Sequence, residues 1–164
     1  VAPTGDLFVS DAANARVFHL DAAGRYIDVF AESVEAPWAR LLSPAGVACS
    51  PDGTEIYVCD PGAGRVVVFD PLGVPIRLIG EGDLKEPVNA AVSSERQIFV
   101  ADRKDRSVFV FSSNGALVDR IKGAPPEIPE WSGPTDVAVR DSTLWVADPA
   151  AGQIVVLRLN SPSQ

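Results

Sequence analysis

Side chains that commonly serve catalysis and metal binding are scarce in this chain of 164 residues. It has one histidine, His19, two cysteines and no methionine. Zinc sites normally need three or four His, Cys or carboxylate ligands. The sequence also has no Gly-x-Ser-x-Gly elbow, no phosphate-binding glycine loop and no haem-attachment cysteine pair. We therefore predict no catalytic residues, no metal site and no cofactor within this chain.

Positive charge and long apolar runs are scarce as well. Only three of the 14 basic residues are lysines, 22 residues are acidic, and the net charge is -8. Nucleic-acid affinity depends largely on cationic neutralisation of phosphates, so this balance makes nucleic acid an unlikely partner. Apolar runs stop after a few residues, as at 66–69, far short of the ~20 residues that span a bilayer. No membrane span is predicted.

The two cysteines, Cys49 and Cys59, are not expected to form a disulfide. If Ser50 pairs with Glu55 across the turn between them, the two thiols point to opposite faces of one sheet. The sequence therefore predicts two free buried thiols, and the redox compartment stays open.

What the chain has in quantity is a repeated β-hairpin pattern. Its clearest copy runs from Glu55 to Phe69, where two β-branched and aromatic runs flank the turn Pro-Gly-Ala-Gly. Four copies are anchored by aspartates that lie 49, 42 and 46 residues apart: Asp11, Asp60, Asp102 and Asp148. This spacing is typical of propeller blades or of comparable β repeats.

Two further strands complete each repeat. A short strand that begins at proline precedes the hairpin at 44–49, 87–92 and 134–139, and a half-polar strand follows it at 26–30, 76–79 and 117–121. The chain is therefore predicted to be all-β, a β-propeller of four-stranded antiparallel blades that forms a partial ring. We expect one domain over residues 1–159, with blades at about 1–31, 44–80, 87–123 and 134–159, and a tail at 160–164.

Residues 44–73 resemble the NHL repeat of six-bladed propellers. They contain, in order, proline, Gly-Val-Ala, Asp-Gly, Ile-Tyr-Val-Cys-Asp, Arg-Val-Val-Val-Phe-Asp and a closing glycine. The resemblance extends over residues 1–159, although Ser107 and Gln153 replace the arginine found at Arg16 and Arg65. It implies a propeller fold and says little about function, because propellers serve many activities.

Fewer than four blades are present where the resemblance implies six, and the chain has no initiating methionine. We expect a portion of a longer chain. The alternatives are an arc that completes its ring with a second copy or another chain, and a closed four-bladed ring.

Two connections between blades, 31–43 and 123–133, are rich in proline and contain a tryptophan each. Loops on one face of a rigid scaffold are where binding residues concentrate, and Trp and Arg are enriched at energetic hot spots. Each tryptophan could instead fill the gap between neighbouring blades, and the arginines could form structural ion pairs. The candidate binding residues on this loop face are Trp38, Arg40, Arg65, Arg103, Arg106 and Trp131.

The four aspartates that anchor the hairpins invite two interpretations. They could form a ring of carboxylates, or each could accept backbone N–H groups of the turn that follows it. A residue present in every repeat usually serves the repeat, so we interpret Asp11, Asp60, Asp102 and Asp148 as structural turn caps.

The sequence favours a non-catalytic binding or scaffolding module that uses the loop face to bind a protein or peptide. The alternative is a part of a propeller enzyme of the lactonase or peptidyl-hydroxyglycine amidating-lyase kind, with a central metal site supplied partly by missing blades. RNA binding ranks third because of the charge. The preference for Arg over Lys favours a bacterial periplasmic or secreted protein.

Overall fold

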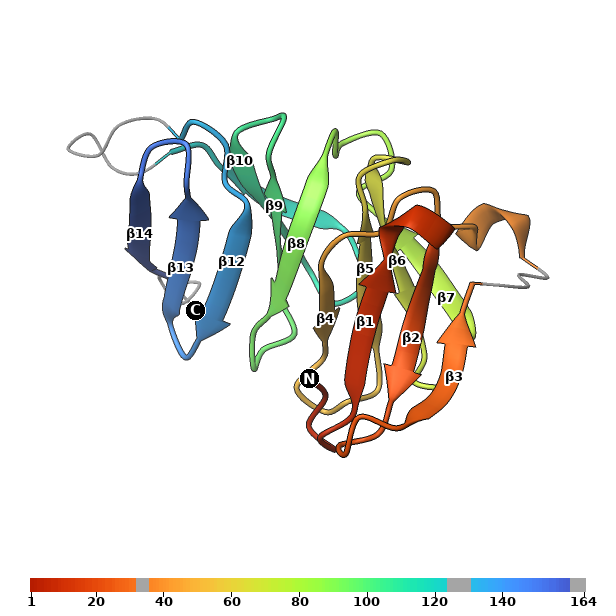
Figure 1. The fold of residues 1–164 in the computed structure, drawn as a ribbon. Coiled ribbons are helices and arrows are strands. Elements are labelled where there is room, and N and C mark those ends of the chain that lie inside the picture. The colour runs from red at the N-terminus through yellow and green to blue at the C-terminus, as the bar shows by residue number, and fades with distance from the viewer. Residues whose placement is uncertain (32–35, 124–130, 160–164) are drawn as a thin grey trace.

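The computed structural model describes residues 1–31, 36–123 and 131–159 as four antiparallel sheets that follow one another along an arc (Figure 1). The first contains β1 (Leu7–Asp11), β2 (Arg16–Leu20) and β3 (Tyr26–Phe30), and the second β4 (Val47–Cys49), β5 (Ile56–Asp60), β6 (Arg65–Phe69) and β7 (Pro75–Ile79). The third contains β8 (Pro87–Val92), β9 (Ile98–Asp102), β10 (Ser107–Phe111) and β11 (Leu117–Ile121), and the fourth β12 (Asp136–Arg140), β13 (Thr143–Asp148) and β14 (Gln153–Arg158).

The predicted all-β blade architecture is confirmed. Strands follow one another in chain order within every sheet, and the helical elements among the described residues are two short 3-10 turns, η1 (Ala12–Asn14) and η2 (Pro37–Ala39). The first and fourth sheets have three strands each and the two central sheets have four. In the part of the chain that the structure describes, no helix is long and apolar enough to span a membrane.

Both faces of the central sheets are buried, which explains their continuous apolar strands. Along β5, Ile56 and Val58 face the first sheet, whereas Tyr57 and Cys59 face the third. The same alternation along β9 divides its side chains between the two neighbouring sheets. Since side chains of a strand alternate between faces, a strand covered on both sides needs apolar residues at every position.

Both cysteines are free thiols, as predicted. Cys59 is fully buried in the cluster between the second and third sheets, while Cys49 is half-buried and packs against the cluster on the other face. Their opposite directions keep the two sulfur atoms from forming a bond.

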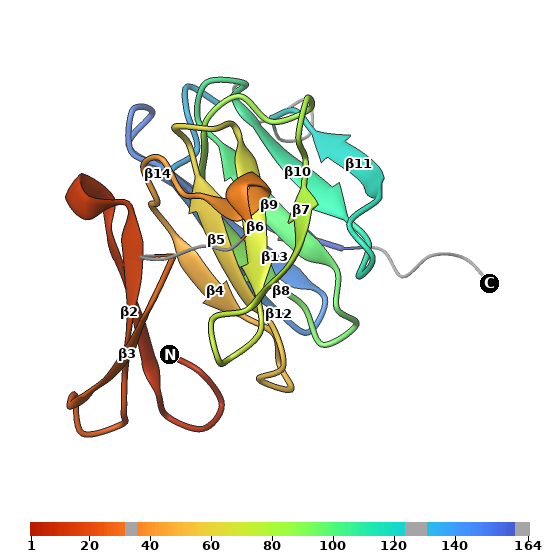
Figure 2. The same ribbon diagram turned by 90° about the vertical axis from the view of Figure 1, so that its right-hand side faces the viewer.

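The inner strands β4, β8 and β12 lie side by side along the concave edge of the arc (Figures 1 and 2). Gly46, just before β4, donates its N–H to the carbonyl of Val88 at 2.9 Å, which joins the second sheet to the third. The equivalent residue of β8, Asn89, donates its side-chain amide to Asp136 of β12. A Cβ atom at Gly46 would lie 2.7 Å from the Asn89 Cα and from the Val88 carbonyl oxygen. Glycine is therefore required here for the approach of two backbones.

A charged network joins the second and third sheets on the opposite face to the hairpin turns. Arg77 of β7 donates to both carboxylate oxygens of Glu55, at 2.5 and 3.1 Å, and to the carbonyl of Ser113 in the third sheet. Arg96, in the turn before β9, donates to Glu55 at 2.8 Å, and the Tyr57 hydroxyl does so at 2.5 Å. The hydrogen bonds from Arg77 are the main reason that the pKa of Glu55 lies at about 2.

Gly46→Ala is expected to lower the free energy of unfolding by about 1–3 kcal/mol, because its methyl group has no space between the two inner strands. Gly133→Ala is the matched control, since a Cβ there would lie 3.4 Å from the flexible Arg103 side chain and needs no backbone shift. Urea unfolding curves of both variants provide the comparison. Equal losses would show that the contact at Gly46 is not tight.

The free energy of unfolding is expected to decrease as the pH is lowered, because Glu55 becomes protonated. The pKa of this carboxyl is lower in the folded chain than its ordinary value of 4.5. Its stabilising contribution is therefore complete above pH 4.5 and is lost as the pH falls towards 2, by about 3 kcal/mol in total. Glu55→Gln should flatten the stability profile in this range, whereas Glu81→Gln should not, because the Glu81 side chain is 67% exposed. Parallel profiles for wild type and Glu55→Gln would contradict the assignment.

Candidate functional site

The candidate site is the loop face, where the hairpin turns of the sheets meet the connections between sheets. Asp60, at the end of β5, holds the connection that enters its sheet. This side chain is fully buried, and its Oδ2 and Oδ1 atoms accept the backbone N–H groups of Leu42 and Ser43 at 3.0 and 2.8 Å. The carboxylate thereby connects the first blade-to-blade connection to the second sheet.

The next two sheets repeat this arrangement. Asp102 Oδ2 accepts the N–H groups of Lys85 and Glu86 at 2.6 and 3.0 Å, and Asp148 Oδ2 accepts that of Ser132 at 2.6 Å. Both are fully buried and also accept, through Oδ1, an N–H group from the turn that follows them. The donors lie one or two residues before the proline that precedes each inner strand. That constant register is the sequence signal that could have revealed these bonds.

Asp11 of the first sheet accepts hydrogen bonds from residues of the hairpin that it anchors. It accepts the backbone N–H of Asn14 at 3.2 Å, the Asn14 side-chain amide at 2.8 Å and the Nε of Arg16 at 3.1 Å. The turn that follows is therefore bound by the side chains of Asp11, Asp102 and Asp148, as expected of turn caps, whereas the Asp60 side chain binds the preceding connection instead. Their geometry suits positioning of loops and offers no shared ring of carboxylates.

The connection that Asp60 holds displays its side chains in strict alternation. Ala39 and Leu41 are fully buried, whereas Trp38 is 43% exposed, Leu42 is 55% exposed and Arg40 is exposed. We call Trp38, Arg40 and Leu42 the exposed strip. Sequence reasoning selected Trp38 and Arg40 and missed Leu42, although its spacing of two residues from Arg40 was a usable signal.

Arg65 lies beneath the exposed strip and is largely covered. Its side chain is 12% exposed, its Nη2 donates to the Arg40 carbonyl at 2.9 Å, and its Nη1 lies 3.5 Å from Glu81. Arg65 therefore fixes the backbone of Arg40 and does not itself offer a surface to a partner.

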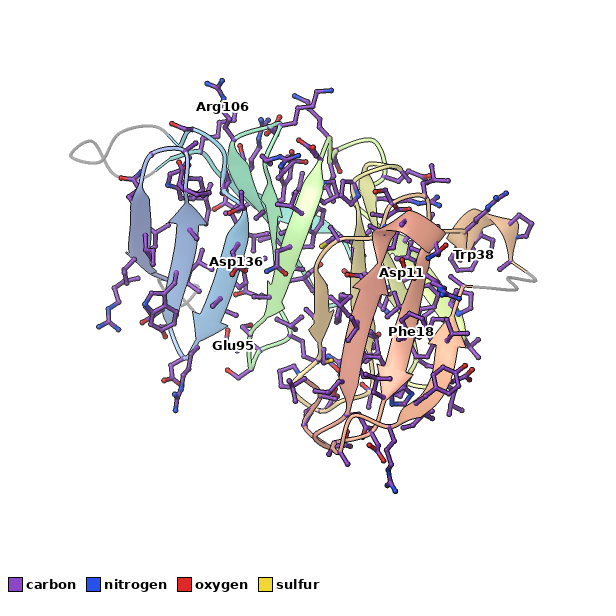
Figure 3. The ribbon with its side chains drawn as sticks, in the orientation of Figure 1. Asp11, Phe18, Trp38, Glu95, Arg106 and Asp136 are labelled. Carbon is purple, nitrogen blue, oxygen red and sulfur yellow. The ribbon has the colours of Figure 1, made fainter. Side chains whose placement is uncertain are left out.

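Arg103 and Arg106 form a separate group on the hairpin turn of the third sheet. Arg103 is engaged by both carboxylate oxygens of Glu86, whereas Arg106 is exposed and has no ion pair with any described residue. Figure 3 places Arg106 well apart from Trp38 across the molecule. The structure does not gather the predicted arginines and tryptophans into one patch.

Trp131 lies in the core, which corrects its expected place on the exposed face. It is 1% exposed and belongs to the cluster between the third and fourth sheets, with Phe99 and Leu144. Its position three residues before the inner-strand proline is equivalent to those of buried Leu41 and Leu84. Alignment on these prolines would have identified Trp131 as a residue that fills the gap between blades.

His19, the histidine of the chain, is part of a packed aromatic cluster in the first sheet. His19 is buried, stacks on Phe8 with ring centres 4.5 Å apart, and lies 3.3 Å from Asp6. Within 1–31, 36–123 and 131–159, no three His, Cys, Asp or Glu side chains are placed to hold a metal ion.

No protein-family model matches the chain. The E3 ubiquitin-protein ligase NHLRC1 of Rattus norvegicus is 28% identical over 130 residues, which cover 76% of this chain and 32% of that protein. NHL-repeat-containing protein 4 of Homo sapiens is 38% identical over 68 residues, 42% of this chain and 54% of that protein. The chain therefore spans about a third of the length of the ligase and about half of the second relative.

Solved structures share the fold. Virginiamycin B lyase of Staphylococcus aureus has a TM-score of 0.71 and 16% sequence identity, over 99% of this chain and 55% of that one. Kuenenia stuttgartiensis hydrazine synthase has a TM-score of 0.66 and 21% identity, over 96% of this chain and 48% of that one. At these identities the likeness concerns the fold alone. Together with the curated relatives, it confirms the resemblance to NHL-repeat propellers.

Asp60→Ala is expected to destabilise the chain by about 3 kcal/mol, because the backbone N–H groups of Leu42 and Ser43 lose a buried carboxylate acceptor. Asp70→Ala is the matched control, since Asp70 accepts two N–H groups in an exposed turn where water can replace it. Thermal and urea unfolding measure the difference. If both substitutions had the same effect, the buried bonds of Asp60 would not hold the connection.

Proposed function

We propose that this chain, an NHL-repeat β-propeller, is a non-catalytic module that binds a protein or peptide through the exposed strip of its loop face. The observation that carries the proposal is the alternation at Trp38, Arg40 and Leu42. Two large apolar side chains and an arginine point to solvent on a backbone that is held from below.

Preorganisation makes such a strip suitable for recognition. Asp60 holds the N–H group of Leu42, and Arg65 holds the carbonyl of Arg40, so the backbone is ordered before any partner binds. Binding then loses less conformational entropy than it would for a loop without these bonds. Trp and Arg are also the side chains that most often dominate binding energy at interfaces.

Similarity to E3 ubiquitin-protein ligases supports a protein partner. The lyases support only the fold, and an enzyme of the lactonase or amidating-lyase kind would need catalytic groups that the described residues do not gather. A further copy or chain that completes the ring stays a prediction. So does a bacterial extracytoplasmic location, since the curated relatives compared above are mammalian.

The test begins with peptides selected from an unbiased 12-residue phage library on the folded chain. Trp38→Ala combined with Leu42→Ala is expected to weaken the selected peptides at least tenfold, because two apolar contacts are removed. Biolayer interferometry with purified peptides measures the affinities.

The matched control combines Tyr26→Ala with Leu72→Ala. These side chains are 61% and 81% exposed and lie outside the exposed strip, on β3 and on the turn before β7. Binding should change less than twofold in this control. Peptides that bind the Trp38 and Leu42 double variant as tightly as the wild type would refute the proposed function.

A further inference from the structure

A cavity of about 310 Å³ opens beside the exposed strip, between the hairpin turn of the first sheet and the connection that carries Arg40. Two arginines and an asparagine are among the residues that line it. It is lined by Asn14, Ala15, Arg16, Ala31, Arg40 and Leu41.

Comparison with the second sheet explains why this space is open. There, the positions of Ala15 and Ala31 are taken by Gly64 and Gly80, and Leu84 of the next connection presses on both. A Cβ at Gly64 would lie 3.0 Å from the Leu84 carbonyl oxygen, and one at Gly80 would lie 2.4 Å from its Cδ1. At the equivalent place in the second sheet, Leu84 therefore occupies the space that is open in the first sheet.

In the first sheet, alanine methyl groups occupy both positions, and the cavity opens between them and the connection at Arg40 and Leu41. Ala15 and Ala31 have φ angles of 54° and 66°, a left-handed conformation that glycine adopts more easily. The same positions are left-handed in the other sheets, at Gly64, Arg106 and Gly152 for the turn and at Gly80 after the outer strand, so the conformation belongs to the repeat. The first sheet differs in having alanine at both positions that border the cavity.

The arginines at the cavity favour an anionic ligand. Arg16 is paired with Asp11 at 3.1 Å and lies over the Phe18 ring at 4.6 Å, so its charge is already compensated and the charge available to a ligand is that of Arg40. The Arg40 side chain forms no ion pair with any described residue, while Arg65 holds its carbonyl. A carboxylate can accept parallel hydrogen bonds from a guanidinium, which gives both affinity and direction.

We infer that this cavity binds the carboxylate of an acidic side chain on the partner, with a neighbouring apolar side chain of that partner against Trp38. The inference rests on the proposed function and adds the chemistry of the partner. A peptide carboxylate suits the site better than a polynucleotide, because the net charge of -8 repels a long phosphate backbone whereas one charged side chain can be held locally.

A double-mutant cycle tests the contact. Selected peptides that contain Asp or Glu are remade with Asn or Gln, and each pair is measured on the wild-type chain and on Arg40→Gln. We expect the amide peptide to bind the wild type about tenfold more weakly and to bind Arg40→Gln within twofold of its acidic parent, because the charge pair is already lost. Arg140→Gln is the control, since Arg140 is an exposed arginine of β12 without an ion pair to any described residue.

The outcomes separate the two proposals. If acidic and amide peptides differ equally on the wild type and on Arg40→Gln, or if strip-dependent peptides contain no acidic residue, the inference is wrong and the proposed function stands. A phosphoserine peptide that binds at least tenfold more tightly than its Glu counterpart would assign the cavity to phosphate and overturn the carboxylate. Peptides insensitive to Trp38→Ala with Leu42→Ala would overturn the proposed function and the inference with it.

Discussion

The loop face of this chain depends on three buried carboxylates, which lie at the ends of β5, β9 and β13. Asp60, Asp102 and Asp148 are fully buried and accept backbone N–H groups from the connection that enters their own sheet. Each bond joins backbone N–H groups to a carboxylate that is itself buried and has little access to water, which makes the bond strong and costly to remove. Connections of different length and composition are thereby held in one register over a repeated scaffold.

This constraint lets individual connections differ without loss of the fold. The connection before the third sheet packs Leu84 against two glycines, whereas the connection before the second sheet leaves a cationic cavity and displays Trp38. Function in such a repeat is therefore expected where one unit departs from the others. The same fold in lyases and in hydrazine synthase agrees with this view, because a propeller does not by itself specify an activity.

The candidate site was predictable in part. Trp38 and Arg40 were selected because they lie on a proline-rich connection between repeats, and both are exposed. Trp131 has the same residue type on an equivalent connection and is nevertheless buried. Residue type alone could not predict which of the two tryptophans is exposed and which is buried. Their distance from the next inner strand decides whether the side chain points between the sheets or towards solvent.

The sequence by itself determined the all-β blades, their strands and the free thiols, because these follow from local alternation, turn residues and a period that repeats along the chain. Only the tertiary structure decided that Asp60 binds the preceding connection, that Arg65 lies beneath Arg40, and that a cavity opens beside Ala15. These features depend on how closely one sheet approaches the next. That approach is set by packing between residues far apart in the chain, which no local pattern records.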